Sequence, residues 1–334
     1  MNLSHSLYFL PRLFVFALLG CLLFLASCKK EEVNGGNTID TLINSDPQYS
    51  LLKTAIRYTG LTGTLKAGTL TFFAPNDAAF RAAGFTDTAS IVSHSIDSIA
   101  NIIRYHIMGA TIPTSLFPKT KIDTPLIPLV LTDTFALRAL DTAQASILVI
   151  NGVLYISNAG QDVFVNGGRI TQANITAQNG VIHSIDRLLN PAIGNLSKTI
   201  SKNPKLSMFS TALKIVGGQT AAYLAGRGPL TVFAPSDQAF ADAGITMATL
   251  NAMPKDSLAK QLSYHFIKAR RFSNQFLNGK VFRTLQGNTI TMSVNGATIG
   301  VKDAGGAAPA LLNKTDYIAT NGVVHVIGSV LKYK

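Results

Sequence analysis

The stretch TFFAPNDAAF, at residues 71–80, decides the fold, because the chain repeats it with few changes as TVFAPSDQAF at 231–240. In both copies a run of apolar, aromatic and β-branched residues predicts a buried strand, which the proline at Pro75 or Pro235 ends. Asn76 and Ser236 then occupy the position of a helix N-cap. Each stretch therefore predicts a strand, a tight corner and a helix, and the aspartate after each cap, Asp77 or Asp237, favours the first helical turn.

Two further motif pairs repeat in the same order. Three motifs in one order, twice, indicate two tandem homologous domains rather than an array of short repeats. The second and third motifs are 74 residues apart in copy one (105 to 179) and 57 apart in copy two (264 to 321), so copy one carries about 17 extra residues within 110–165. The additional pairs are RYHI at 104–107 with SYHF at 263–266, and NGVIHSIDRLL at 179–189 with NGVVHVIGSVL at 321–331.

The spacing of apolar residues predicts further elements in both copies. The Asn-Gly pairs predict two-residue hairpin turns or the entry to a strand. Gly84 and Gly244 are typical helix stops. The expected helices cover 49–56, 96–106, 208–216 and 257–265, the expected hairpin turns lie at 151–152, 166–167 and 295–296, and the closing strands cover 181–185 and 323–327.

The composition is that of a globular protein. Of 334 residues, 47% are hydrophobic and 14% are charged, so the chain can bury a core, which disordered chains cannot. The net charge of +12 favours anionic partners in general, but its Lys and Arg residues form no run with interleaved aromatics, so nucleic-acid binding is not expected. There is no Trp, which disfavours a dedicated carbohydrate-binding module.

The N-terminal residues 1–27 are typical of a signal peptide. An apolar run of 13 residues, 13–25, is shorter than the roughly 20 residues of a membrane-spanning helix, although a short anchor is the alternative interpretation. The run ends in LASC, residues 25–28, which resembles the bacterial lipobox. The resemblance implies cleavage before Cys28 and lipid on its thiol; several acyl chains together anchor a protein stably.

Residues 28–39 then predict a flexible, lipidated tether, because Gly and Asn follow a short charged run. Charges directly after the lipid cysteine resemble the signals that send some lipoproteins to the outer face of the outer membrane. We therefore expect an outer membrane lipoprotein of the cell envelope, exposed at the surface; a periplasm-facing protein is the alternative. The two domains are expected at 40–191 and 196–334.

The motifs together resemble the fasciclin-like domain family. The resemblance lies in the strand followed by Ala-Pro-(Asn/Ser)-Asp-x-Ala-Phe, the Tyr-His pair, and Asn-Gly-Val-(Ile/Val)-His-x-Ile, each present in both copies. It implies an α+β fold of two tandem domains, each a β-sandwich wedge with a helical cluster along one edge. It also implies a role in cell adhesion and no general enzymatic activity. Copy two departs from copy one by carrying Gly328 where copy one has Asp186.

The recurring polar residues have both a functional and a structural interpretation. A Tyr-His motif is linked to adhesion in animal members of the resembled family, which makes Tyr105, His106, Tyr264 and His265 possible adhesion residues. The structural interpretation, a buried ring with satisfied hydrogen bonds, is the favoured one. For His183 and His325, inside apolar strands, we expect buried structural roles rather than a ligand or base role. Two histidines without nearby Cys, Asp or Glu make a poor zinc site, so no metal is expected.

No catalytic residue or cofactor is expected from the sequence. Asp77 and Asp237 fit helix capping better than acid–base catalysis, and Ser236 lacks the elbow of a nucleophilic serine. We expect a non-enzymatic, lipid-anchored adhesion or binding protein, and a hydrolase is the least favoured class. The alternative is a glycan-binding subunit of a surface capture or uptake system. The expected partners are the membrane, through the lipid, and an extracellular matrix polymer, glycan or surface protein.

Overall fold

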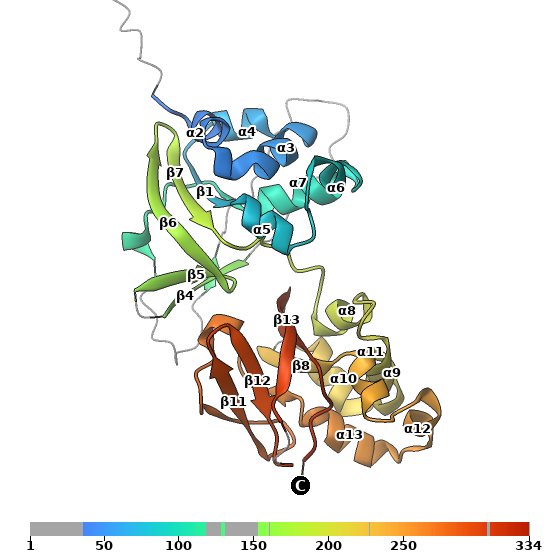
Figure 1. The fold of residues 1–334 in the computed structure, drawn as a ribbon. Helices are drawn as coiled ribbons and strands as arrows, with labels where there is room; N and C mark the ends of the chain where they lie inside the picture. The colour runs from blue at the N-terminus through green and yellow to red at the C-terminus, as the bar shows by residue number, and fades with distance from the viewer. Residues whose placement is uncertain are drawn as a thin grey trace, which may run out of the picture.

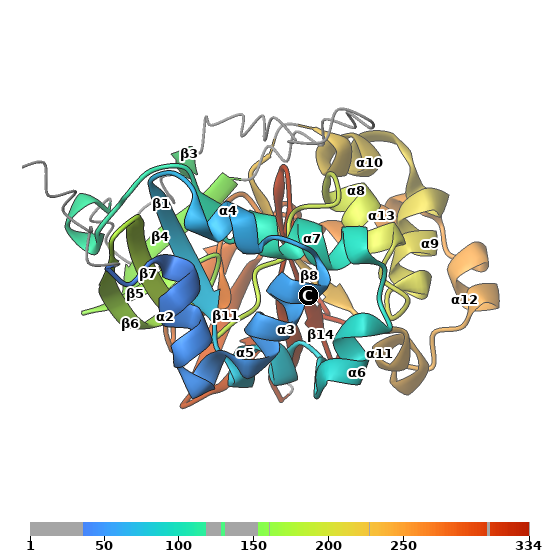
Figure 2. The ribbon, with the colours of Figure 1, turned by 90° about the horizontal axis from the view of Figure 1, so that it is seen from above.

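The computed structural model describes residues 36–117, 128–130, 153–159, 161–226, 228–305 and 308–333. They form two domains, which lie one above the other in Figure 1 and follow each other along the chain. Each domain combines one curled β-sheet with a group of helices, so the expected α+β pair of domains is confirmed. The view from above, in Figure 2, shows the helices gathered beside the sheets rather than around them.

The first domain contains a seven-stranded sheet in the order β2-β1-β7-β6-β5-β4-β3. Its strands are β1 (Leu70–Pro75), β2 (Ile107–Met108), β3 (Pro128–Val130), β4 (Val153–Ala159), β5 (Asp162–Val165), β6 (Gly168–Ala177) and β7 (Gly180–Ile185). Its helices are α2 (Ile39–Ser45), α3 (Ser50–Tyr58), α4 (Thr62–Lys66), α5 (Asp77–Ala82), α6 (Thr88–Val92) and α7 (Ile96–Tyr105), with 3-10 turns η1 (Pro47–Tyr49) and η2 (Thr114–Leu116).

The second domain repeats this arrangement with the strand order β10-β11-β12-β13-β14-β8-β9. Its strands are β8 (Leu230–Pro235), β9 (Phe266–Ile267), β10 (Val281–Arg283), β11 (Thr289–Asn295), β12 (Thr298–Lys302), β13 (Ala310–Ala319) and β14 (Gly322–Ile327). Its helices are α8 (Leu196–Ser201), α9 (Ser207–Val216), α10 (Gly218–Ala225), α11 (Asp237–Asp242), α12 (Met247–Ala252) and α13 (Lys255–Ser263), with the 3-10 turn η3 (Ser273–Gln275).

The centre of each sheet is a parallel pair of strands that are far apart in sequence. β1 lies beside β7 over six residues, and β8 lies beside β14 in the same register. All four strands are buried along their whole length, as expected for a parallel pair covered on both faces. The repeated stretch and the Asn-Gly motif therefore meet at the centre of each domain, although they begin 108 residues apart in the first domain (71 to 179) and 90 apart in the second (231 to 321).

The Asn-Gly motif makes this pairing possible in two ways. Gly180 has φ +148°, and a Cβ there would lie 1.9 Å from the carbonyl oxygen of Leu70 on the neighbouring strand. Asn179 accepts a hydrogen bond from the N–H of Ile39, at the start of α2, and donates to the carbonyl of Leu65 at 2.8 Å. The glycine thus lets the strands approach, while the asparagine ties two helices to the strand.

The second domain uses the same device. A Cβ on Gly322 would lie 2.3 Å from the carbonyl oxygen of Leu230. Asn321 accepts from the N–H of Leu196, at the start of α8, at 2.8 Å, and it donates to the carbonyl of Leu224 at 2.9 Å. Because both copies need these contacts, the Asn-Gly motif belongs to the fold.

The expected turns are confirmed in one place and shifted in another. Asn166 and Gly167, with φ of +47° and +80°, form the tight turn between β5 and β6. Between β11 and β12 the turn residues are Gly296 and Ala297 rather than Asn295 and Gly296, because Asn295 still pairs with Thr298. The expected turn at 151–152 lies outside the described residues, as does most of the longer section within 110–165.

The two domains are joined by an ion pair whose acidic side chain is buried. The side chain of Asp316, in β13, is 1% exposed, and its carboxylate accepts from the guanidinium of Arg187, which follows β7 in the first domain and is 36% exposed. The N–H of Ser273 also donates to it, at 2.7 Å. Burial alone raises the pKa of Asp316, but Arg187 and the hydrogen bonds of Ser273 outweigh this and hold that pKa below its usual value.

Comparison of the two copies shows that the ion pair is specific to the junction. Asn174 occupies the place of Asp316 in the first domain: both have positive φ, and Asn174 accepts from the N–H of Thr114 as Asp316 does from Ser273. The neutral Asn174 is thus sufficient for the fold of a domain, and only the second domain, which faces Arg187, carries a charged residue, Asp316, at this position.

Aromatic and polar contacts extend the same junction. The guanidinium of Arg270 lies 4.3 Å from the ring centroid of Tyr155 in β4, and the Tyr155 ring lies 6.0 Å from that of Phe272. Arg270 is buried and donates to three backbone carbonyls of its own domain, so it forms a fixed surface for the tyrosine. Asn274 donates to the hydroxyl of Ser157 across the junction at 2.9 Å. Together these contacts fix the orientation of the two domains.

The approach of β1 to β7 predicts the effect of adding one methyl group. Gly180→Ala should lower the free energy of unfolding of the first domain by more than about 3 kcal/mol, because the Cβ collides with a backbone carbonyl that cannot move aside. The matched control is Gly63→Ala in α4, where a Cβ meets nothing within 4 Å. Urea unfolding of the two variants measures the difference, and equal stability would contradict the close approach.

The ion pair at the junction predicts a second effect. Asp316→Asn supplies the residue of the sister copy, so the second domain should fold, but Arg187 loses its partner. Since Arg187 is about a third exposed, we expect a loss of only about 1–2 kcal/mol, together with wider relative motion of the domains. Small-angle X-ray scattering of the fragment 33–334 reports that motion. An unchanged scattering curve would show that the pair does not fix the domains.

Candidate functional site

The two tyrosines of the Tyr-His motifs lie in the hydrophobic core. Tyr105 ends α7, and its hydroxyl donates to the carbonyl of Val153 at 2.9 Å and accepts from the side chain of Asn166. Tyr264 is fully buried, and its hydroxyl donates to the carbonyl of Thr289 at 2.7 Å. Each ring therefore links the end of a helix to the far half of the sheet, and neither offers a surface to a partner.

The histidines that follow these tyrosines are also fully buried. Nδ1 of His106 donates to the carbonyl of Ile102 at 2.8 Å, and its Nε2 accepts from the N–H of Leu189 at 2.9 Å. His265 makes the same pair of bonds with Gln261 and Leu331. An N–H group can only donate, so the ring nitrogen that accepts from it carries no proton, and both rings are neutral.

The pKa values agree with this geometry. Burial lowers the pKa of His106 to about 4 and that of His265 to about 4, because desolvation disfavours the charged ring. A protonated ring would also lose the bond to Leu189 or Leu331. The two imidazoles thus act as clamps that fasten the segment after the last strand to the end of a helix.

His183 and His325 are clamps of the same kind inside the central strands. Nε2 of His183 donates to the carbonyl of Ile112 at 3.0 Å, and its Nδ1 accepts from the N–H of Asn174 at 3.2 Å. His325 bonds in the same way to the carbonyl of Arg271 and the N–H of Asp316. Burial lowers the pKa of both rings. Both side chains are fully buried.

The two aspartates of the repeated stretch cap a helix other than their own. Oδ1 of Asp77 accepts from the N–H of Leu51 at 2.9 Å, so it caps α3, whose own N-cap residue makes no such bond. Asp237 accepts in the same way from Met208 at 2.8 Å and caps α9. The expected caps of the following helices are confirmed, because Asn76 accepts from Ala79 and Ser236 from Ala239.

The polar residues at 75–77 and 235–237 therefore do not converge on a catalytic site. Asp77 and Asp237 accept from backbone N–H and serine hydroxyl groups, and the hydroxyl oxygen of Ser236 accepts from the N–H of Ala239 at a helix start. Within the part of the chain that the structure describes, no group of three or more His, Cys, Asp or Glu side chains could hold a metal ion. Cys28, the expected lipidation residue, lies outside the described residues.

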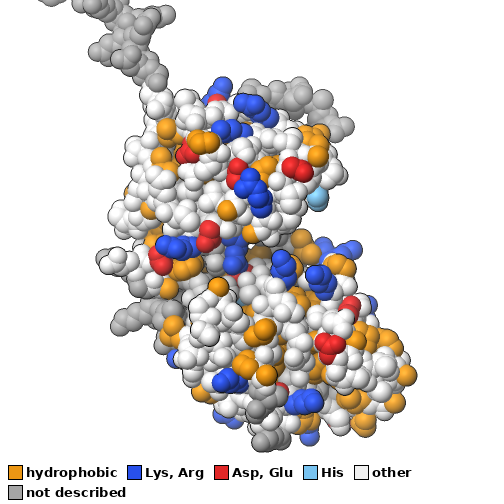
Figure 3. Space-filling model, in the orientation of Figure 1, with side chains coloured by type: hydrophobic (Ala, Val, Ile, Leu, Met, Phe, Trp, Pro, Cys, Tyr) orange, Lys and Arg blue, Asp and Glu red, His pale blue; other side chains and the backbone are white. Residues whose placement is uncertain are grey.

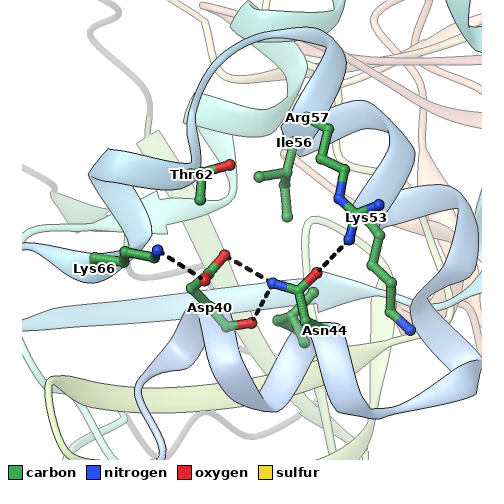
Figure 4. Close-up of a pocket in the computed structure, with 8 residues that line it drawn as sticks. Asp40, Asn44, Lys53, Ile56, Arg57, Thr62 and Lys66 are labelled. Atoms are coloured by element: carbon green, nitrogen blue, oxygen red, sulfur yellow. Dashed lines mark hydrogen bonds and ion pairs between the residues drawn. The ribbon is translucent and has the colours of Figure 1, made fainter.

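The structure brings together one polar cluster that the sequence motifs did not indicate. The side chains of Asp40, Lys53, Arg57 and Lys66 surround a pocket of about 230 Å³ between α2, α3 and α4 (Figure 4). These residues belong to no repeated motif. The signal that could have found them is a difference between the copies, because Ser210 follows the start of α9 where Lys53 follows the start of α3, and Ser197 stands where Asp40 does.

Among the described residues, every helix is too short or too polar to cross a bilayer. Figure 3 shows Lys and Arg side chains on both domains and on either side of the waist between them. The positive charge is thus distributed over the face shown rather than gathered in one groove.

Comparisons with known proteins identify what the chain resembles. The family profile described as "Fasciclin domain" matches residues 47–191 and 204–333. Human periostin (Homo sapiens) is 33% identical over 171 residues, which cover 51% of this chain and 19% of periostin. The transforming growth factor-beta-induced protein ig-h3 of Sus scrofa is 27% identical over 266 residues, 79% of this chain and 35% of that protein.

One solved structure aligns with this chain over both of its domains. It is the FAS1 domain pair from the insect cell adhesion molecule Fasciclin I, with a TM-score of 0.40, 15% sequence identity, and coverage of 88% of this chain and 95% of that chain. The chain spans about a fifth of the length of periostin and about a third of that of the ig-h3 protein.

The buried neutral histidines predict sensitivity to acid. Their pKa is lowered in the folded state, so between pH 6.5 and about 4 the unfolded chain binds more protons, and the free energy of unfolding falls as pH falls. The stabilisation is fully present above pH 6.5. At pH 5 we expect a loss of about 2 kcal/mol for each of His106 and His265 relative to pH 7.5.

Urea unfolding at the two pH values measures this loss. The control is His94→Asn, which removes an exposed histidine and should leave the difference between the two pH values as in the unmodified protein. A free energy of unfolding that is the same at pH 7.5 and pH 5 would show that these rings are not held neutral.

Proposed function

The chain belongs to the fasciclin domain family, with two tandem copies, and from this premise we propose that it is a lipid-anchored adhesion protein of the cell envelope. The observation that carries the proposal is the use of every recurrent polar motif residue in holding the fold. These side chains are bonded to backbone groups, so a partner can contact only the outer surface of the two domains, whose relative orientation is fixed. That surface suits binding to a large partner better than catalysis on a small one.

The relatives support the adhesive part of the proposal. The solved domain pair comes from a protein that is itself described as a cell adhesion molecule. Two joined domains present two binding surfaces on one tether, so weak contacts at each can add to firm attachment. The proposed partner is a matrix polymer or a surface protein that the outer face of the domain pair contacts.

The anchor in the proposal rests on the sequence around Cys28. Residues 1–27 would be removed and Cys28 would carry lipid, leaving a mature chain of net charge +11, since Arg12 alone among the charged residues is lost (12 − 1). A basic protein on a lipid tether would be drawn to an anionic surface over a Debye length, about 8 Å at physiological salt. Attachment would therefore weaken as salt rises.

The anchor predicts a labelling result. Cells grown with an alkyne-tagged fatty acid should label the unmodified protein, and Cys28→Ala should abolish the label because the acceptor thiol is gone. Cys21→Ala is the matched control, since it removes the only other cysteine of the chain and should leave the label intact. Label that persists in Cys28→Ala would contradict lipidation at this residue.

The same cells test the adhesive role. Protease added to intact cells should degrade the protein and reduce attachment of the cells to matrix-coated or glycan-coated surfaces. A protein that resists protease on intact cells faces the interior of the envelope, and adhesion would then be ruled out. Attachment that depends on glycan coating alone would favour the glycan-capture alternative.

A further inference from the structure

The pocket between α2, α3 and α4 has an excess of positive charge. Lys53 and Arg57 come from successive turns of α3, and Lys66 comes from the last turn of α4. Against these three cations stands one carboxylate, that of Asp40 on α2, so the formal charge of the lining is +2 (3 − 1). The net charge indicates an anionic ligand.

The lining is organised by a chain of contacts, which Figure 4 shows as dashed lines. Asp40, itself nearly buried, forms an ion pair with Lys66 at 3.7 Å and accepts from the side-chain amide of Asn44 at 3.0 Å. The oxygen of the same amide accepts from the guanidinium of Arg57 at 3.4 Å. Asp40 therefore orients both ends of the cluster, so two of the three cations are held in place before any ligand arrives.

Lys53 completes the cluster without an internal partner. It makes no hydrogen bond or ion pair with any residue in the described ranges, and Figure 4 shows it on the opposite side of the pocket from Lys66. Ile43 and Ile56 provide an apolar floor, and the hydroxyl of Thr62 adds a polar atom to the lining. Such a pocket offers charged donors to an anion and an apolar surface to the carbon atoms that carry it.

The sister domain shows that the fold does not require this lining. Equivalent hydrogen bonds align the helices of the two copies. Asn179 and Asn321 accept from the N–H groups of Ile39 and Leu196. Asp77 and Asp237 accept from those of Leu51 and Met208. In that alignment the apolar floor is kept, whereas most of the charge of the lining is lost. Ile43 and Ile56 correspond to Ile200 and Leu213, whereas Asp40, Asn44, Lys53 and Arg57 correspond to Ser197, Ser201, Ser210 and Lys214.

We propose that this pocket, lined by Lys53, Arg57 and Lys66, binds a phosphate monoester group attached to a small carbon body. A phosphate monoester carries a charge of about −1.5 to −2 at pH 7 and three acceptor oxygens, which match a lining of charge +2 with several N–H donors. The volume of about 230 Å³ accommodates the phosphate and a few carbon atoms, but not a polymer segment of any length.

The ligand has two possible sources with the same chemistry: a lipid head group or a free sugar or polyol phosphate. α2, α3 and α4 lie at the end of the molecule farthest from the second domain (Figure 1). If Cys28 carries lipid as proposed above, the eleven residues 28–38 span at most about 40 Å, which keeps this end of the domain near a membrane. Only the lipid source depends on the proposed anchor; the pocket itself does not.

The test uses the soluble fragment 33–334 and two probes, glycerol 3-phosphate in calorimetry and phosphatidic acid vesicles in flotation, with phosphatidylcholine vesicles as the neutral reference. Lys53→Ser/Arg57→Ser should weaken binding at least tenfold, since two charge-assisted contacts are lost. The matched control is Lys198→Ser/Lys214→Ser on α8 and α9, which removes the same charge from the exposed surface of the sister helices and should change binding less than twofold. Equal thermal unfolding temperatures verify that both variants fold.

Each outcome of these measurements either supports the proposed site or overturns it. Binding of either probe that the pocket variant loses and the control keeps supports the site, and the probe that binds identifies its source. Failure of the unmodified fragment to bind either probe overturns the proposal, as does an equal loss in both variants, which would show a general charge effect. A failure of the lipid anchor in cells would leave the glycerol 3-phosphate result unaffected, so the two proposals stand or fall separately.

Discussion

The parallel pairing of the first and last long strands of each domain is the constraint on which the rest of the structure depends. β1 with β7, and β8 with β14, are the two ends of a domain brought side by side, and no hairpin can join strands that run in the same direction. Closing such a loop costs conformational entropy that only contacts of high sequence separation can offset. The repeated motifs supply those contacts: Asn179, Asp77, His106 and His183 each bind backbone groups of a segment distant in sequence.

Comparison of the two copies distinguishes residues that the fold requires from residues that it only tolerates. Residues that recur with the same partners in both copies, such as His106 and His265, are required by the shared architecture. Residues that differ between equivalent positions are not required by the shared architecture. Two such differences carry the specific features of this molecule: Asp316 in place of an asparagine creates the buried link to Arg187, and Lys53 in place of a serine provides a cation for the pocket.

Much of the fold could be predicted from the sequence because its signals are local. The prolines that end β1 and β8, the caps at Asn76 and Ser236, and the turn at Asn166 and Gly167 each depend on a few consecutive residues. The capping of α3 by Asp77, the junction at Asp316 and the pocket around Lys53 depend instead on segments that only the folded chain brings together. The shift of the expected 295–296 turn to Gly296 and Ala297 has the same origin, because the register of β11 and β12 is set by the whole sheet.

The central claim, that the recurrent histidines serve the fold as neutral clamps, is tested most directly by nitrogen NMR of the imidazole rings at pH 7 and pH 5.5. The structure predicts that His106 and His265 carry a proton on Nδ1 and stay neutral at both pH values, and that His183 and His325 carry their proton on Nε2 at pH 7. Rings that exchange between the two tautomers, or that become charged near pH 6.5, would show side chains open to solvent and contradict the account.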